Sequence, residues 1–130
     1  MSGTLLLDCE GLSKLVRRTP ELTEWLAAAE AEDIRVITSA VTLVEARDPT
    51  TNQARFDHAV SRVNIIPTTE AIARHAGKLV AAAGLHGHKY AIDAIVAATA
   101  MACRSPVTVL TSDPEDLLML CGPDVRVIKI

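Results

Sequence analysis

Four acidic residues, spread along a chain of 130, could together perform metal-dependent chemistry. Asp8 and Asp113 each follow a short apolar run that is typical of a buried strand. Glu45 and Asp93 lie among apolar neighbours in stretches that have the character of helices. Acidic side chains are rarely buried unless they are paired or bound to a metal ion. These four residues are therefore the candidate catalytic and metal-binding residues.

A cluster of carboxylates predicts a particular kind of chemistry. Gathered carboxylates need hard cations, and all-oxygen octahedral sites select Mg²⁺ or Mn²⁺. Such ions activate water and stabilise charge on a phosphodiester. Few basic side chains are placed to pair with these acids in place of a metal ion. Near Asp93, only Lys89 lies within one helical turn along the chain. For Glu45 the nearest basic residue is Arg47, which is expected to point to another face.

Each of the four acids also has an ordinary structural explanation. Asp8 could cap the helix that follows it, and Asp113 before Pro114 resembles a helix N-cap with proline in the first turn. Asp93 could be favoured by a helix dipole, and Glu45 could be a solvated helix position. Four independent accidents explain the set poorly, because a parallel sheet would bring the four elements together. We therefore expect a single acidic cluster.

The elements that would position these acids alternate between strand and helix. This alternation favours an α/β fold, with a parallel sheet covered by helices on both faces and ligands at the carboxyl edge of the strands. Strands are expected at residues 4–7, 35–38, 64–67, 107–110 and 125–130. Helices are expected at 10–17, 20–32, 40–46, 52–62, 70–84, 90–104 and 115–121, with a polar loop at 85–89.

Bulk composition limits the class of protein. The chain is 49% hydrophobic and 22% charged, so it is expected to form one globular domain, residues 1–130. Aromatic residues make up only 2%, which argues against a base-stacking surface for single strands. Three cysteines without a CxxC pair suggest free thiols in the cytoplasm, and no stretch is long enough to span a membrane. Because the net charge is −3, binding of nucleic acid would need metal ions or a local basic patch.

Four segments of the chain resemble motifs of the PIN-domain nucleases, and within them the VapC-type toxins of toxin–antitoxin pairs. Their order and spacing match along essentially the whole chain, and the third and fourth segments are the most specific. The segments are residues 5–8 (LLLD), 39–45 (SAVTLVE), 93–100 (DAIVAATA) and 110–116 (LTSDPED).

The resemblance implies a fold, an activity and partners. The fold would be a three-layer α/β/α PIN-like fold with a parallel sheet of four or five strands. Asp8, Glu45, Asp93 and Asp113 would bind one or two Mg²⁺ or Mn²⁺ ions, directly or through water. The substrates would be RNAs, often tRNA or ribosomal RNA, and the partner would be an antitoxin whose tail enters the active site. The resemblance also implies a homodimer.

The resemblance gives two further residues a role. The hydroxyl of Thr111 would help to fix the last acid and solvent. Asp116 matches a position where many members carry a further acid, which makes it a candidate metal ligand. Members usually have phenylalanine after that acid, whereas this chain has Leu117, so the role of Asp116 stays open.

Basic and histidine residues have weaker claims to function. Lys89, Arg17 and Arg18 could contact RNA phosphates, although most surface lysines and arginines are simply solvated. His86 and His88 form a His-x-His pattern that could bind a transition metal, but a solvated loop explains it better.

Two other functions remain open on the sequence alone. One is an α/β phosphatase or phosphotransfer domain with an aspartyl nucleophile, but Asp8, Cys9 and Glu10 depart from the DxD pattern of such phosphatases. Cys9 itself fits a small packed thiol better than a nucleophile. The other is a catalytically inactive PIN-like module that only binds a partner, and the intact set of four acids argues against it.

Overall fold

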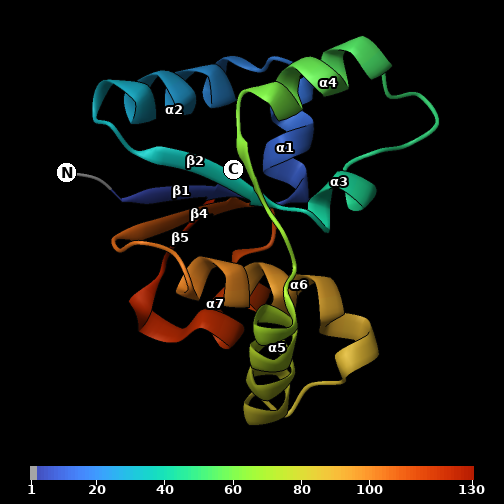
Figure 1. Cartoon of the computed structure of the whole chain (residues 1–130), viewed down its shortest axis with the longest axis vertical. Helices are drawn as coiled ribbons and strands as arrows, with labels where there is room; N and C mark the ends of the chain where they lie inside the picture. The colour runs from blue at the N-terminus through green and yellow to red at the C-terminus, as the bar shows by residue number, and fades with distance from the viewer. Residues whose placement is uncertain (1–2) are drawn as a thin grey trace.

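The strands of the computed structural model, which describes residues 3–130, are β1 (Thr4–Leu7), β2 (Arg35–Ser39), β3 (Asn64–Ile66), β4 (Val107–Thr111) and β5 (Arg126–Lys129). They form one parallel sheet in the order β3–β2–β1–β4–β5 (Figure 1). Leu7 is in register with Thr38 of β2 on one side and with Leu110 of β4 on the other. The carboxyl ends of the three central strands therefore meet at one edge of the sheet.

Two layers of helices cover the faces of the sheet (Figure 1). One layer consists of α1 (Cys9–Val16), α2 (Pro20–Ala31) and α4 (Gln53–Ser61). The other consists of α5 (Glu70–Ala82), α6 (Gly87–Met101) and α7 (Pro114–Cys121). The short α3 (Thr42–Glu45) follows β2 at the carboxyl edge, and a 3₁₀ turn (Gly122–Asp124) leads into β5. The expected three-layer α/β/α fold is confirmed.

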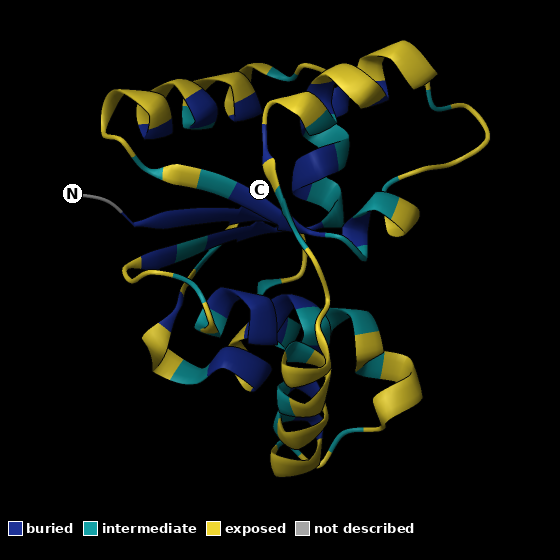
Figure 2. Ribbon diagram, in the orientation of Figure 1, coloured by how far each residue is buried: buried dark blue, intermediate teal, exposed yellow. Residues whose placement is uncertain are grey.

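The core consists of two hydrophobic clusters, one under each helical layer (Figure 2). Side chains of β1 alternate between them, so Leu6 packs with residues of α6 and α7 while Leu5 and Leu7 pack with residues of α1 and α2. All four residues of β1 are buried, as expected for a central strand that is covered on both faces. Within the described residues, no helix is both long and apolar enough to cross a lipid bilayer.

Capping residues set the starts of three helices close to the expected positions. The side chains of Thr19, Asn52 and Thr69 each accept a hydrogen bond from the backbone N–H three residues later. These bonds satisfy N–H groups that have no partner within the helix. After α5 the chain reaches Gly84, whose φ of 69° is a conformation that glycine adopts easily, and the helix ends there as expected.

Two expected boundaries around the acids were wrong. The helix expected over 40–46 is only the four residues of α3, because the chain first turns through Ala40 and Val41. The polar loop expected at 85–89 ends early, because α6 begins at Gly87 and ends at Met101 rather than near 104. The first turn of α6 is polar and exposed, so no hydrophobic pattern marks it, and it places Lys89 on a helix.

Candidate active site

Asp8 lies where β1 ends and α1 begins. Its carboxylate accepts a hydrogen bond from the backbone N–H of Gly11 at 2.9 Å and so caps α1. The residue is buried, and burial raises the pKa of its carboxyl, while hydrogen bonds from Thr111 and Gly11 oppose that rise. The capping explanation of Asp8 is therefore correct, and the two donors also hold the carboxylate in one orientation at the sheet edge.

Thr111 connects Asp8 to Asp113. It is the last residue of β4 and is fully buried. Its hydroxyl accepts a hydrogen bond from the backbone N–H of Asp113 at 3.0 Å and also bonds to the Asp8 carboxylate. A threonine hydroxyl has one proton, so it donates to Asp8 and accepts from Asp113. One side chain thus links the ends of two neighbouring strands.

Asp113 and Asp116 lie at the start of α7. Asp113 occupies the N-cap position, but its exposed side chain makes no capping hydrogen bond. The N-cap explanation accounts for the position of this residue and leaves its carboxylate unexplained. Burial raises the pKa of Asp116. A hydrogen bond with Asp113 and the negative charge of Asp113 raise this pKa as well, whereas the positive charge of Lys89 lowers it. These two acids and Lys89 are therefore close neighbours.

Asp93 carries the clearest sign that the acids are clustered. It lies in the second turn of α6 and is half-buried. The pKa of its carboxyl is raised to about 6, first by burial and then by the negative charges of Asp116, Glu45, Asp113 and Asp8, in that order. Four acids from three other parts of the chain therefore act on a single carboxyl group.

Glu45 differs from its expected environment. It was expected to face the core among apolar neighbours, but it is exposed at the end of the short α3, in which only Thr42 is buried. Its partner is Cys9. Burial raises the pKa of the Cys9 thiol far above its usual range, and a hydrogen bond from the thiol to Glu45 contributes. A thiol held protonated in this way is a poor nucleophile.

The charge of this cluster is not balanced by paired cations. None of the ion pairs within residues 3–130 includes Asp8, Glu45, Asp93, Asp113 or Asp116. Nor do any three acidic, histidine or cysteine side chains in that part of the chain converge tightly enough to form a ready-made metal site. The acids thus lie within electrostatic reach of one another but not at coordination distance from a common point.

Comparison with known families identifies the family of this chain. A sequence model described as the PIN domain matches residues 5–117. The chain belongs to the PIN domain family. The match includes all five acids and extends to Leu117, so the four matching segments described above lie within it. No curated protein matches this PIN domain in sequence.

Solved structures share the fold over nearly their whole length. The VapBC2 complex of Rickettsia felis with a promoter DNA fragment has a TM-score of 0.74 at 18% identity, covering 98% of both chains. A toxin–antitoxin complex from Klebsiella pneumoniae has a TM-score of 0.67 at 25% identity, covering 97% of this chain and 99% of that one. DNA-bound VapBC from Salmonella typhimurium has a TM-score of 0.67 at 15% identity, covering 98% of each.

The candidate basic residues Lys89 and Arg17 have different acidic neighbours. Lys89 is exposed, acts electrostatically on Asp116 and lies 5.3 Å from the ring centre of Tyr90. Arg17 instead pairs with Glu10 at 3.0 Å on the exposed side of α1. Lys89 is therefore the cation that the fold brings to the acidic cluster.

Three other sequence candidates stay outside the cluster. Arg18 is exposed with a φ of 57°, in the turn after α1. His86 and His88 are exposed, and their ring centres are 6.1 Å apart. No third ligand joins the histidines within residues 3–130.

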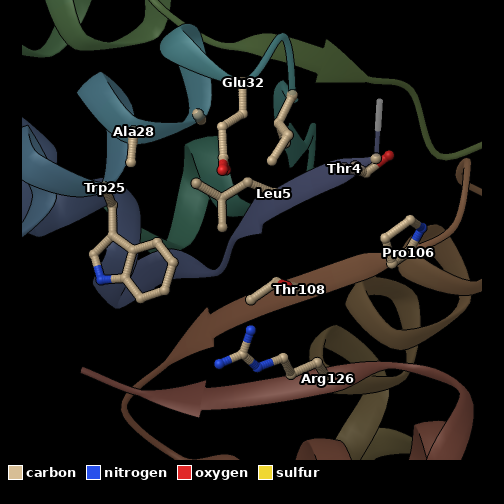
Figure 3. A pocket seen from close by; sticks show the side chains of 11 residues that line it. Thr4, Leu5, Trp25, Ala28, Glu32, Pro106, Thr108 and Arg126 are labelled. Atoms are coloured by element: carbon tan, nitrogen blue, oxygen red, sulfur yellow. The ribbon is translucent and has the colours of Figure 1, made fainter. Parts of the chain in front are cut away.

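A partly open cavity of about 450 Å³ lies away from the acids (Figure 3). It lies at the amino-terminal end of β1 and β4, where Trp25 of α2 and Arg126 of β5 face it. None of the five acids lines this cavity. The cavity and the acidic cluster are therefore at opposite ends of the central strands.

Sequence reasoning missed two polar residues behind the acids. Thr38 at the end of β2 and Thr42 at the start of α3 are both fully buried. The available signal was a pair of threonines four residues apart, between an apolar strand and Glu45. Such a pair is ambiguous in sequence, because threonine is common in strands and at helix starts.

Proposed function

We propose that this PIN domain, residues 1–130, is a metal-dependent endoribonuclease of the VapC type. The observation that supports this most is that the charges of Asp116, Glu45, Asp113 and Asp8 all act on the half-buried Asp93 and add to the rise in its pKa that burial causes. A structural role for these acids would be served better by pairing with cations, and none of the ion pairs within residues 3–130 involves them. Excess negative charge at a sheet edge is what a divalent cation would relieve.

The donor set fits Mg²⁺ or Mn²⁺. Asp8, Asp93 and Asp113 would hold an ion together with Glu45, and Asp116 is placed to join them. All these donors are carboxylate oxygens, which suit hard octahedral cations. Because the acids do not yet converge, binding would require the exposed side chains to turn inward. The ion would supply charge stabilisation at the phosphodiester and a lowered pKa of bound water.

The remaining residues of the site would orient the Asp8 carboxylate and bind the RNA. Gly11 and Thr111 hold the Asp8 carboxylate in place through the backbone N–H and the hydroxyl. Lys89, beside Asp116, is the side chain placed to contact a phosphate of the RNA. Arg17 is occupied by Glu10, so we assign it and Arg18 no more than a peripheral contribution.

The structural neighbours support one partner of the PIN domain. The Klebsiella pneumoniae structure is a toxin–antitoxin complex, so we propose a cognate antitoxin for this chain. We also propose RNA as the substrate, with tRNA or ribosomal RNA as the class, a homodimeric state and a cytoplasmic location. Expression in a bacterial host should slow growth unless the cognate antitoxin is supplied.

A cleavage assay with a matched control tests the activity. Purified protein is incubated with tRNA and ribosomal RNA fragments, with Mg²⁺, with Mn²⁺ or with EDTA. We expect metal-dependent cleavage that falls by ~10²-fold or more in Asp93→Asn, because one ligand and its charge are lost. Asp57→Asn removes an exposed acid of α4 and should cut at the wild-type rate.

Two results would contradict the proposal in different ways. Cleavage by Asp93→Asn at near the wild-type rate would reject the assignment of the site. A wild-type protein that cuts no RNA with either metal would favour the inactive PIN-like binding module.

A further inference from the structure

We propose that Thr38 and Thr42 are positioning residues that fix Asp8 and Glu45 relative to each other. The proposal rests on the nuclease function proposed above and extends it to residues that touch neither substrate nor metal. Both threonine side chains are fully buried behind the acidic edge. Their hydroxyls connect the two backbone segments that carry these acids.

Thr38 acts on the Asp8 side. Its hydroxyl donates a hydrogen bond to the carbonyl oxygen of Leu7 at 2.7 Å. That carbonyl belongs to the peptide bond that leads into Asp8, and Leu7 is the register partner of Thr38 across the β1–β2 ladder. The orientation of the peptide before Asp8 is therefore fixed by a side chain as well as by the sheet.

Thr42 acts on the Glu45 side. It is the first residue of α3, and its hydroxyl donates to the carbonyl oxygen of Ser39 at 2.7 Å. The hydroxyl oxygens of Thr38 and Thr42 are also 2.5 Å apart, and either hydroxyl can donate to the other when it does not donate to its carbonyl oxygen. Three short oxygen contacts thus connect the end of β1 to the start of α3.

The Thr42 hydroxyl helps to anchor α3. The helix has four residues and no side-chain cap, so neither propensity nor capping stabilises it. Thr42 is its only buried residue, Leu43 packs against the hydrophobic cluster that includes α1, and Glu45 at the other end is exposed. The direction in which Glu45 points therefore depends in part on how the Thr42 end is held.

Substitution by valine can separate a positioning role of the two threonine hydroxyls from simple packing. Valine has nearly the volume of threonine, so it would fill the same space without the hydroxyl. The two hydroxyls have two protons for three short oxygen contacts. Loss of one hydroxyl must therefore redistribute the bonds of the other, so the two sites should be coupled.

The experiment compares hydroxyl removal with hydroxyl retention at each site. Thr38→Val and Thr42→Val remove the hydroxyl, and Thr38→Ser and Thr42→Ser keep it. Thr99→Val is the matched control, because Thr99 is also fully buried and donates at 2.7 Å to Ile95 within its own helix. The readouts are the Mg²⁺ midpoint of metal-induced thermal stabilisation and the cleavage rate at saturating Mg²⁺.

We expect the valine variants at 38 and 42 to raise the Mg²⁺ midpoint or lower the rate by about 10- to 100-fold, as loss of a group that orients a metal ligand does. The serine variants should have a Mg²⁺ midpoint and a cleavage rate close to those of the wild type, and Thr99→Val should change neither readout. The double valine variant should be less impaired than the sum of the two single variants predicts. If Thr42→Val does not fold, Thr42→Ala against Thr42→Ser makes the same comparison.

Failure of the proposed function and failure of the inference about the threonines give different results. If the wild type shows neither metal-induced stabilisation nor cleavage, the proposed function itself is wrong. If the wild type shows both and the valine variants match Thr99→Val, the threonines only fill space and the inference is overturned.

Discussion

Asp8 has a structural and a chemical role at the same atoms. Its carboxylate caps α1 through Gly11 and is bonded by Thr111, yet it also adds to the negative field around Asp93. The cap explanation and the site explanation of such a residue are therefore compatible. A helix N-terminus with its N–H groups is one of the few surroundings that stabilise a buried carboxylate without an ion pair.

Substitution of Asp8 can separate these two roles. Asparagine caps helices about as well as aspartate, so Asp8→Asn should keep α1 stable while it removes the charge. Asp8→Ala removes both and should cost about 1 kcal/mol of unfolding free energy relative to Asp8→Asn. Urea denaturation of the metal-free protein measures the difference. Equal stability of the two variants would show that the bond to Gly11 contributes nothing.

Asp93→Asn should stabilise the metal-free protein at neutral pH. The pKa of Asp93 in the folded protein is about 6, above the ordinary 3.8, so its ionisation destabilises the fold. The penalty is absent below about pH 3.8 and complete above about pH 6. Because the group is half-exposed, solvent screening reduces the effect to about 1 kcal/mol, or roughly 3–5 °C in Tm.

Thermal melts of both proteins across pH 4 to 8 in EDTA provide the measurement. The difference in Tm between Asp93→Asn and wild type should grow as the pH rises through this window and then level off. The difference reports the ionisation of Asp93 together with its electrostatic coupling to Asp8 and Asp116, which titrate in both proteins. A variant that melts lower than wild type at pH 7 would mean that the Asp93 carboxylate has a stabilising partner.

Gly11 lets α1 pack closely against the sheet. A Cβ added at Gly11 would lie 3.1 Å from the Cβ of Leu7 and 3.4 Å from the carbonyl oxygen of Leu110. Both neighbours belong to buried central strands that cannot move aside easily. Gly11 therefore allows the start of α1, and with it Asp8, to lie directly over β1 and β4.

Gly11→Ala should accordingly destabilise the protein by about 1 kcal/mol. Overpacking costs ~1–3 kcal/mol, and the better helix propensity of alanine returns less than ~1 kcal/mol. Gly77→Ala is the control, because a Cβ there meets nothing within 4 Å and the residue lies inside α5. Chemical denaturation should show that Gly77→Ala stabilises. If both variants stabilise, the contact under α1 is not tight.

The elements also show what sequence can predict. Apolar runs and capping residues located all five strands and most helix starts, because these signals are local. The length of α3 could not be predicted, since Thr42 is anchored by the hydroxyl of Thr38 and the carbonyl oxygen of Ser39, both at the end of β2. The same holds for Glu45, whose apolar sequence neighbours suggested burial although only Thr42 of that helix is buried.

The acids themselves were predicted by type and position, but their relations were not. That Thr111 bonds to Asp8 as well as to Asp113 depends on the register of β1 and β4. That Asp116 faces Lys89 depends on the packing of α6 against α7. Such contacts between distant segments leave no local pattern in a single sequence.

At the scale of the whole molecule, we expect a dimer in solution. Large hydrophobic side chains are exposed at Val44 of α3 and at Leu118 and Met119 of α7, with exposed fractions of 79%, 48% and 52%. A typical stable interface buries roughly 800 Å² per partner, about a tenth of the 7129 Å² surface of this chain.

Light scattering at micromolar concentration measures the assembly. The expected mass is twice the 13.9 kDa of the chain, with or without Mg²⁺. Leu118→Lys places a charge on the exposed face of α7 and tests whether that face contributes. A monomer mass for the wild type under both conditions would reject the dimer.

The order of the strands bears on when the site can exist during synthesis. β1 is made before the other four strands and lies at the centre of the sheet, yet its partner β4 is translated about a hundred residues later. Until then one edge of β1 has no partner, and Thr111, Asp113 and Asp116 have not been made. A nascent chain at that stage carries Asp8, Glu45 and Asp93 without the acids of α7. The proposed nuclease site is completed only once β4 and α7 have been made, so a chain that still lacks them cannot cut the RNA of the ribosome that is making it.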